Sequence, residues 1–267
     1  MKLKVEIEDS HVAALEGKVF GLLEPVWYSI KDAEKYLLDG YTSEEADRQP
    51  DYLSKPRKMP HPSFGFSMIN CKAGQFFAKI SGTICAICYG EPVPGRHYGR
   101  PDYMTKSLRT IESIKKPFWK EAMSFILAEH GWDSFRWFDN GDLQDVKMLE
   151  DIIWIADQNP KTEFWLPTKE YTMVKKYING GGHVPRNLDI RISGLFTDGR
   201  DLEQKMILAH ALGLNVSAAL DTELFQWMPK SNQVKCHTAK SILGDDNCGD
   251  CRACWKQPVF IILYEVH

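Results

Sequence analysis

Cysteine is the residue whose number and spacing point most directly to chemistry in this chain. Four of the seven cysteines fall within nineteen residues near the C-terminal end, in the pattern C-x11-C-x2-C-x2-C, and two more form a C-x2-C pair in the segment "TICAIC". A C-x2-C spacing closes a short loop, so both thiolates can reach one metal ion or neighbouring irons of one cluster. The residues are Cys236, Cys248, Cys251 and Cys254 in the run, and Cys85 and Cys88 in the pair.

The C-terminal run favours an iron–sulfur cluster over zinc. Three cysteines at C-x2-C-x2-C with a remote fourth are common in cluster ligation, whereas structural zinc more often uses two separated C-x2-C pairs. One alternative is a zinc ion held by Cys85, Cys88 and two of the C-terminal thiols. The other is that the thiols are reduced and bind no metal. The seventh cysteine, Cys71, is either a third thiol for the Cys85/Cys88 site or a buried core cysteine. We therefore expect one or two [4Fe-4S] clusters.

Composition narrows the class of protein. A chain of 267 residues with 43% hydrophobic residues can bury a sizeable core, and a single domain is favoured. A net charge of −3 argues against general coating of nucleic acid. No apolar run reaches the roughly 18 residues of a membrane span, and the charged N-terminal segment is unlike a signal peptide. We expect no membrane partner and a cytoplasmic location, where thiols stay reduced and clustered cysteines bind metal.

The elements that must position these cysteines alternate between strands and helices. Helices are expected within 104–130 and at 145–157, 168–178 and 201–212. The helix at 145–157 has an apolar stripe of Val146, Leu149, Ile153 and Ala156, and Thr168 is the expected cap of the helix at 168–178. Strand–helix alternation at this spacing predicts a parallel sheet in an α/β fold, as a full or partial (β/α) barrel with its chemistry at the carboxyl ends of the strands. Strands are expected at 75–81, 134–139, 162–167, 187–193, 214–220 and 258–265.

The chain divides into three parts on this reading. Residues 1–63 form an N-terminal extension that ends in a Pro- and Lys-rich exposed loop at 48–63. Residues 64–230 form the partial barrel. Residues 231–267 form a cysteine-rich segment that packs on the barrel and binds the cluster.

The cysteine pair and several flanking motifs resemble a known family. "SGTICAICYG" resembles the C-x3-C-x2-C-Y signature of radical S-adenosylmethionine (SAM) enzymes, with Ser81 in the place of the first cysteine. The chain is similar over roughly residues 71–267 to the gene-product-88 family of bacteriophage and plasmid proteins, described as radical-SAM-like and of unknown function. The shared motifs are "RWFDNGDLQD", "PKTEFWLPTKE", "LDIRISG" and the C-terminal cysteine run with Tyr264 and His267. The resemblance implies a radical-SAM-like fold, a [4Fe-4S] cluster, SAM as a second cofactor, and the cytoplasm of a bacterial host.

Four polar residues are candidates for cofactor binding. Asn140 and Asp142 follow a predicted strand, where radical SAM enzymes place an acidic glycine-containing motif that binds SAM; Asp142 as a helix N-cap is the alternative. Lys169 is expected in the first turn of a helix, where a cation is mildly unfavourable unless an anionic ligand or cluster lies nearby; a solvated surface lysine is the alternative. Arg191 lies within an apolar strand and, if it faces the barrel interior, needs either a carboxylate or a ligand.

A basic segment offers a second kind of partner. Residues 91–120 hold seven Lys or Arg and three acidic residues, with Tyr98, Tyr103 and Phe118 among them. Such a patch could contact phosphates and stack on bases of a nucleic acid, or be a solvated helix face.

Two hypotheses of function follow. The chain is either an enzyme of unknown substrate with a SAM-cleaving cluster at Cys85, Cys88 and Cys71, or a non-catalytic iron–sulfur or zinc scaffold that binds nucleic acid or a host protein. Ser81 favours the scaffold, and the polar residues at the barrel mouth favour the enzyme.

Overall fold

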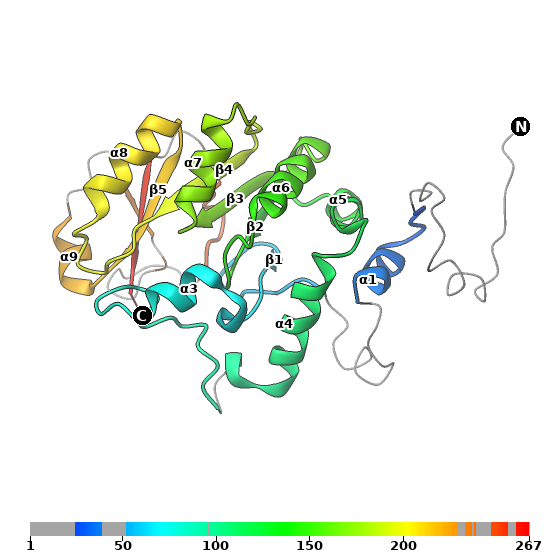
Figure 1. Ribbon diagram of the computed structural model, residues 1–267, viewed down its shortest axis with the longest axis horizontal. Coiled ribbons are helices and arrows are strands. Elements are labelled where there is room, and N and C mark those ends of the chain that lie inside the picture. The colour runs from blue at the N-terminus through cyan, green and yellow to red at the C-terminus, as the bar shows by residue number, and fades with distance from the viewer. Residues whose placement is uncertain are drawn as a thin grey trace, which may run out of the picture.

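The computed structural model describes residues 25–38, 52–94, 97–228, 233–236, 238, 247–255 and 260–266. Within them, seven strands form one parallel sheet in the order β1-β2-β3-β4-β5-β7-β6 (Figure 1). Most of these strands are apolar segments followed by a helix, which is the sequence pattern that gives parallel pairing. The strands are β1 (Ser63–Phe64), β2 (Ser134–Trp137), β3 (Glu163–Thr168), β4 (Leu188–Ser193), β5 (Asn215–Leu220), β6 (Gln233–Lys235) and β7 (Ile261–Glu265).

Helices occupy the connections between these strands. Figure 1 shows α6, α7 and α8 in one row over one face of the sheet, with α4 and α1 beyond the β1 end. The helices are α1 (Ile30–Leu38), α3 (Lys72–Phe77), α4 (Pro101–Ser113), α5 (Trp119–His130), α6 (Val146–Gln158), α7 (Tyr171–Asn179), α8 (Leu202–Leu212) and α9 (Thr222–Trp227), with short 3₁₀ turns at η2 (Met68–Asn70) and η3 (His97–Gly99). No helix in the described ranges is long and apolar enough to cross a bilayer.

The helix α6 shows why the predicted elements form where they do. Asp145 is its N-cap, with the carboxylate Oδ1 accepting a hydrogen bond from the Met148 amide at 2.8 Å. Leu149, Ile153 and Ala156 of the predicted stripe are buried against the sheet. The prediction of an amphipathic helix here is confirmed.

The two faces of the sheet have different chemistry. Phe135 and Trp137 of β2, and Leu188, Ile190 and Ile192 of β4, belong to the hydrophobic core. Because side chains alternate along a strand, the residues between them point to the opposite, inner face. The inner face thereby receives polar and aromatic side chains, including Arg136, Trp165, Arg191, Ser217 and Tyr264.

The parallel α/β architecture predicted from the sequence is confirmed. Strand pairing within the described residues does not join β1 to β6, so the structure shows an open sheet. The first strand was predicted wrongly. Residues 75–81 form the end of α3 and a turn, and the strand that pairs with β2 is Ser63–Phe64, at the end of the segment predicted to be a loop.

Two further local predictions need correction. Thr168 is the last residue of β3 and does not cap α7, whose N-cap position is Glu170. The 48–63 segment is not exposed throughout, because Tyr52 and Leu53 are 1% and 5% exposed. The Tyr52 hydroxyl accepts a hydrogen bond from the Trp119 indole nitrogen at 3.0 Å, which ties this segment to α5.

The C-terminal cysteine segment packs on the inner face of the sheet. Arg191 is fully buried and pairs with Asp189 at 2.5 Å, while its other donors reach the backbone carbonyls of Val216 and Cys254 at 3.2 and 3.3 Å. The Trp255 indole nitrogen donates to the carbonyl of Phe135 in β2 at 2.9 Å. Both contacts join residues 253–255 to strands far earlier in the chain.

We expect Arg191→Met to destabilise the fold strongly, by about 3–5 kcal/mol, because it leaves the Asp189 carboxylate buried without its counter-ion. The matched control is Lys115→Met, which removes one end of the Lys115–Glu112 pair, whose side chains are 66% and 57% exposed. An exposed helical pair of this kind contributes about 0.2–0.5 kcal/mol, so this control should be nearly neutral. Urea unfolding of both variants checks the prediction. Equal losses in the two variants would show that Arg191 does not hold the segment.

Candidate functional site

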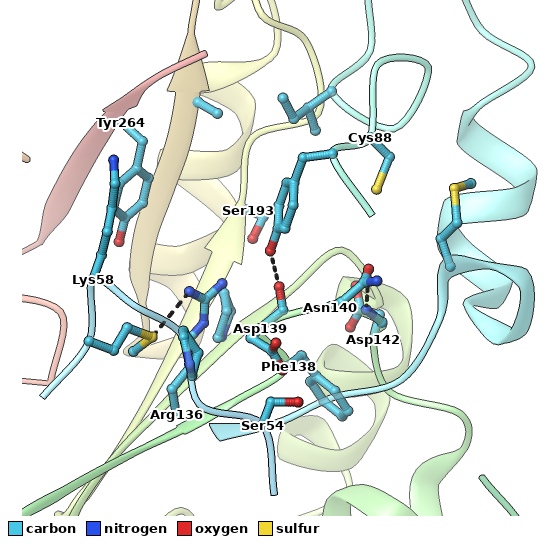
Figure 2. A pocket seen from close by; sticks show the side chains of 18 of the residues that line it. Ser54, Lys58, Cys88, Arg136, Phe138, Asp139, Asn140, Asp142, Ser193 and Tyr264 are labelled. Atoms are coloured by element: carbon cyan, nitrogen blue, oxygen red, sulfur yellow. Dashed lines mark hydrogen bonds between the residues drawn. The ribbon is translucent and has the colours of Figure 1, made fainter. Parts of the chain in front are cut away.

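A cavity of about 950 Å³ lies between the inner face of the sheet and the loops that leave its carboxyl edge. Its wall includes six of the seven cysteines, drawn from two distant parts of the sequence. Figure 2 shows Cys88 on one side of this space and Tyr264 on the other, with Arg136 and Asp139 between them. The cysteines on the wall are Cys71, Cys85, Cys88, Cys236, Cys248 and Cys254.

The first thiol set consists of Cys71, Cys85 and Cys88, which all lie in the connection from β1 to α4. Cys71 is the N-cap of α3, where its Sγ accepts a hydrogen bond from the Gly74 amide at 3.2 Å. The loop that carries Cys85 is fixed to the loop after β4, because the Ile84 amide donates to the Leu195 carbonyl at 2.9 Å. Cys71 thus lies on the same cavity as Cys85 and Cys88, and it is also buried, so its role as a third ligand thiol stays a prediction.

Ser81 does not take part in this set. It is exposed and does not line the cavity, although it stands at the first position of the C-x3-C-x2-C spacing. The neighbouring Gly82 has φ of 80°, a conformation that favours glycine, and its carbonyl accepts a hydrogen bond from the Thr197 amide at 3.1 Å. The turn thus points residue 81 outward and brings Cys85 to the wall.

Lys169 lies among the three thiols. It follows β3 directly and, contrary to the prediction, precedes α7 instead of lying within its first turn. Burial alone would lower the pKa of its ammonium, but the nearby Cys85, Asp142, Cys71 and Cys88 raise it above the ordinary value. Lys169 remains charged and can offset negative charge on thiolates.

Burial favours the neutral form of two of these thiols, Cys71 and Cys85. Burial raises the pKa of Cys71 to about 12, with a further contribution from the Asp142 carboxylate, and burial also raises the pKa of Cys85. Thiolates are the form that binds metals, so a metal would have to displace these protons.

The second thiol set is formed by Cys236, Cys248 and Cys254. The Cys236 amide donates to the Leu263 carbonyl of β7, and the Cys248 amide donates to the Lys58 carbonyl, both at 2.8 Å. The Cys254 Sγ lies 3.1 Å from the Tyr264 hydroxyl oxygen, and burial raises the pKa of this thiol to about 12. Cys251 does not line the cavity, but it influences the pKa of Cys248 and its amide bonds to the Cys248 carbonyl.

The thiols are not arranged around a single ion. In the part of the chain that the structure describes, no three His, Cys, Asp or Glu side chains converge as ligands of one metal ion. Thiolates on one zinc all lie about 2.3 Å from the ion, so they must be in near contact.

Asn140 and Asp142 both lie in the loop after β2, on the cavity wall. Asp142 ties the loop after β2 to the end of β3, accepting hydrogen bonds from the Thr168 hydroxyl at 2.6 Å and from the amides of Lys169 and Leu143 at 2.8 Å. Asp145 caps α6, so the alternative that made Asp142 the cap was wrong. The Asn140 amide nitrogen donates to the Tyr103 hydroxyl at 3.2 Å.

The loop after β2 begins with a strained residue. Phe138 has φ of 56°, in the left-handed region that aromatic residues rarely adopt. Across the cavity wall, Gly90 leaves room for Asn140, because a Cβ there would lie 2.4 Å from its side-chain amide. Strain and close approach of this kind are concentrated at functional sites.

Arg191, the fourth predicted cofactor residue, does not line the cavity. Its partner is the carboxylate of Asp189, one of the two possibilities that the sequence left open. A direct ligand contact by Arg191 remains a prediction.

Sequence reasoning missed Arg136, Trp165 and Tyr264 as wall residues. The Arg136 guanidinium lies over the Trp165 ring at 4.3 Å, and the Trp165 and Tyr264 rings stack with centroids 6.1 Å apart. The available signal was a charged residue between two buried aromatic residues, Phe135 and Trp137, in a short strand.

The basic segment 91–120 does not form one continuous surface. Arg100 and Lys106 line the cavity with Tyr98 and Tyr103, and Arg109 is buried within α4. Lys115 pairs with Glu112 at 2.7 Å, and Lys120 lies over the Trp154 ring at 4.9 Å. Arg96, which belongs to the same predicted patch, lies outside the described residues, as does His267 of the C-terminal motif.

Comparison with known proteins identifies the family but no characterised relative. No curated protein and no solved structure matches the chain. The family model described as Gene product 88 matches residues 37–257, a range that includes the strands β1–β6 and all seven cysteines. This match extends over most of the chain and confirms the family inferred from the order of its motifs, so the chain belongs to the Gene product 88 family.

Proposed function

We propose that this protein binds iron–sulfur clusters on two sides of one cavity. The observation that carries the proposal is the gathering of six cysteines from distant parts of the sequence around a single cavity. Cys71, Cys85 and Cys88 would hold one [4Fe-4S] cluster with an open iron. Cys236, Cys248, Cys251 and Cys254 would hold a second one completely. Three and four thiols are the numbers that one open and one closed cluster require.

The surrounding side chains suit bound thiolates. Lys169 places a positive charge among the first set, which offsets the negative charge of the ligands. Next to the second set, the Tyr264 hydroxyl lies at hydrogen-bond distance from Cys254 and would be the donor once that thiol has lost its proton. When bound, such clusters supply one-electron chemistry at a potential set by nearby charges and hydrogen bonds.

SAM-dependent catalysis is a second candidate, and the first thiol set favours it. An open iron beside Asn140 and Asp142 could accept a small molecule, and a cavity of about 950 Å³ has the volume of a small-molecule site. The radical-SAM-like partial barrel would then hold the cluster and SAM for catalysis. The alternative is a non-catalytic scaffold with structural clusters or zinc, which binds nucleic acid or a host protein.

Protein prepared anaerobically and reconstituted with iron and sulfide should contain about eight irons per chain, with broad absorbance near 400 nm from charge transfer between thiolate and iron. Iron and acid-labile sulfide analysis with the visible spectrum checks this. A content of about four irons would show that the chain binds one cluster and not two. A colourless protein with one equivalent of zinc and no iron would contradict the proposal and support the zinc alternative.

Cys71→Ser should lose about half of the bound iron and keep the fold. Serine caps helices well, so it can replace the cysteine Sγ that accepts from the Gly74 amide, but its oxygen is a poor ligand for iron in a sulfur-rich cluster. The matched control is Ser81→Ala, which removes the exposed serine at the signature position and should retain all the iron. Iron analysis is combined with circular dichroism on each variant. Full iron content in Cys71→Ser would show that Cys71 is not a ligand.

If the first cluster is open to SAM, the protein reduced with dithionite should convert SAM to methionine and 5′-deoxyadenosine. Both products are measured by chromatography with mass detection. Cys71→Ser should form neither, since its open cluster would be lost. Wild-type protein with eight irons that forms no 5′-deoxyadenosine and binds no SAM would support the non-catalytic scaffold.

A further inference from the structure

Arg136 is a cation on the cavity wall without an anionic partner. Its guanidinium lies over the Trp165 ring, and its Nη1 contacts the Met59 sulfur at 3.6 Å (Figure 2). Its Nε is buried and has no acceptor. Among the described residues no carboxylate lies within ion-pair distance of it; Asp139 is near enough to be influenced by its charge but not to pair with it.

This arrangement leaves donors unused. A guanidinium has five N–H groups in a planar fork, and a thioether is only a weak acceptor for one of them. The indole nitrogen of Trp165, beneath the guanidinium, is a second buried donor without an acceptor. Both nitrogens are enclosed by protein atoms, so the donors that a ligand in the cavity could reach are the terminal N–H groups of the Arg136 guanidinium.

The charge of the wall agrees with an anionic occupant. Seven Lys or Arg side chains line the cavity, against four Asp or Glu. Lys58 and Lys106 are among these cations, and their ammonium groups donate to the carbonyls of Thr238 and Leu53 at 3.3 and 2.8 Å. Figure 2 shows Arg136 between Lys58 and Tyr264 on one side and Asp139 on the other.

We propose that Arg136, lying over Trp165, is the binding subsite for the phosphate or carboxylate group of a small-molecule ligand held between the two thiol sets. Arginine suits both groups because its fork matches two oxygens at once. The inference deepens the proposed function, since it names the chemical class of the molecule that the same cavity would take. Binding of the anion does not itself require a cluster.

The test uses the full chain, both as isolated without metal and after anaerobic reconstitution with iron and sulfide. Pyrophosphate and tricarballylate, a tricarboxylate, are titrated separately by calorimetry, so that a phosphate source and a carboxylate source are distinguished. Wild-type protein should bind at least one of them. Arg136→Met, which keeps the side-chain bulk over Trp165, should weaken that binding at least tenfold, because it removes charge-assisted hydrogen bonds.

The control is Arg200→Met. Arg200 also lies over an aromatic ring, that of Phe196 at 4.1 Å, but it pairs with Asp198 and does not line the cavity. The Arg200→Met variant should bind the same anion with the affinity of wild type. Unchanged binding in Arg136→Met, or no binding of either probe to wild type, would overturn the subsite. Loss of iron from Arg136→Met with its anion affinity intact would also overturn it and make Arg136 a counter-ion of the second thiol set. Failure of the chain to load iron, with anion binding lost only in Arg136→Met, would reject the proposed clusters and keep the subsite.

Discussion

A guanidinium buried in a sheet must find acceptors for its hydrogen-bond donors, and Arg191 finds them in a segment that lies far along the chain. Its bonds to Asp189 and to the carbonyls of Ala253 and Cys254 bring the cysteine-rich segment onto the inner face. Trp255 adds a hydrogen bond to β2 from the same segment. The second thiol set lines the same cavity as the first because these contacts fix its backbone. A site made from two distant parts of the sequence thus depends on one buried arginine and on the carbonyls to which it donates.

The polar inner face gives the cavity its character. Helices cover the opposite face with hydrophobic side chains, so that face could tolerate many apolar replacements of similar volume. On the inner face, cations and aromatic rings stand next to protonated thiols. Metal binding would exchange thiol protons for thiolate charge, and Lys169 already lies where that charge would appear. The cavity therefore offers thiols that could bind metal cations and basic side chains that could bind anions.

The sequence was sufficient where local periodicity decides structure. The strands near 134, 162, 187 and 214 and the helix near 145 follow from alternating or helical apolar patterns, and the structure contains them. Residues 75–81 were assigned to a strand because a short apolar run does not distinguish strand from helix, and in fact Phe76 is 64% exposed on a helix that Cys71 caps. β1 has only two residues, too few for any periodicity to show.

The candidate site was predictable only where a local sequence pattern marks its residues. Cysteine spacing marks both thiol groups, and the loop after β2 is marked by its position at the end of a strand. The roles of Arg136 and Trp165 depend on which face of the sheet the C-terminal segment covers, and that is a tertiary contact without a local signal. Arg191 illustrates the same limit: its burial was foreseeable, but the identity of its carboxylate partner required the structure.

The strand order has a consequence for how the last two strands join the sheet. β7 comes after β6 in the chain but lies between β5 and β6 in the sheet, so β6 has no neighbour until β7 is in place. The connection between these two parallel strands is the crossover that carries Cys248, Cys251 and Cys254. Pairing of β7 with both of its neighbours therefore also fixes the C-terminal end of the segment that carries these three cysteines.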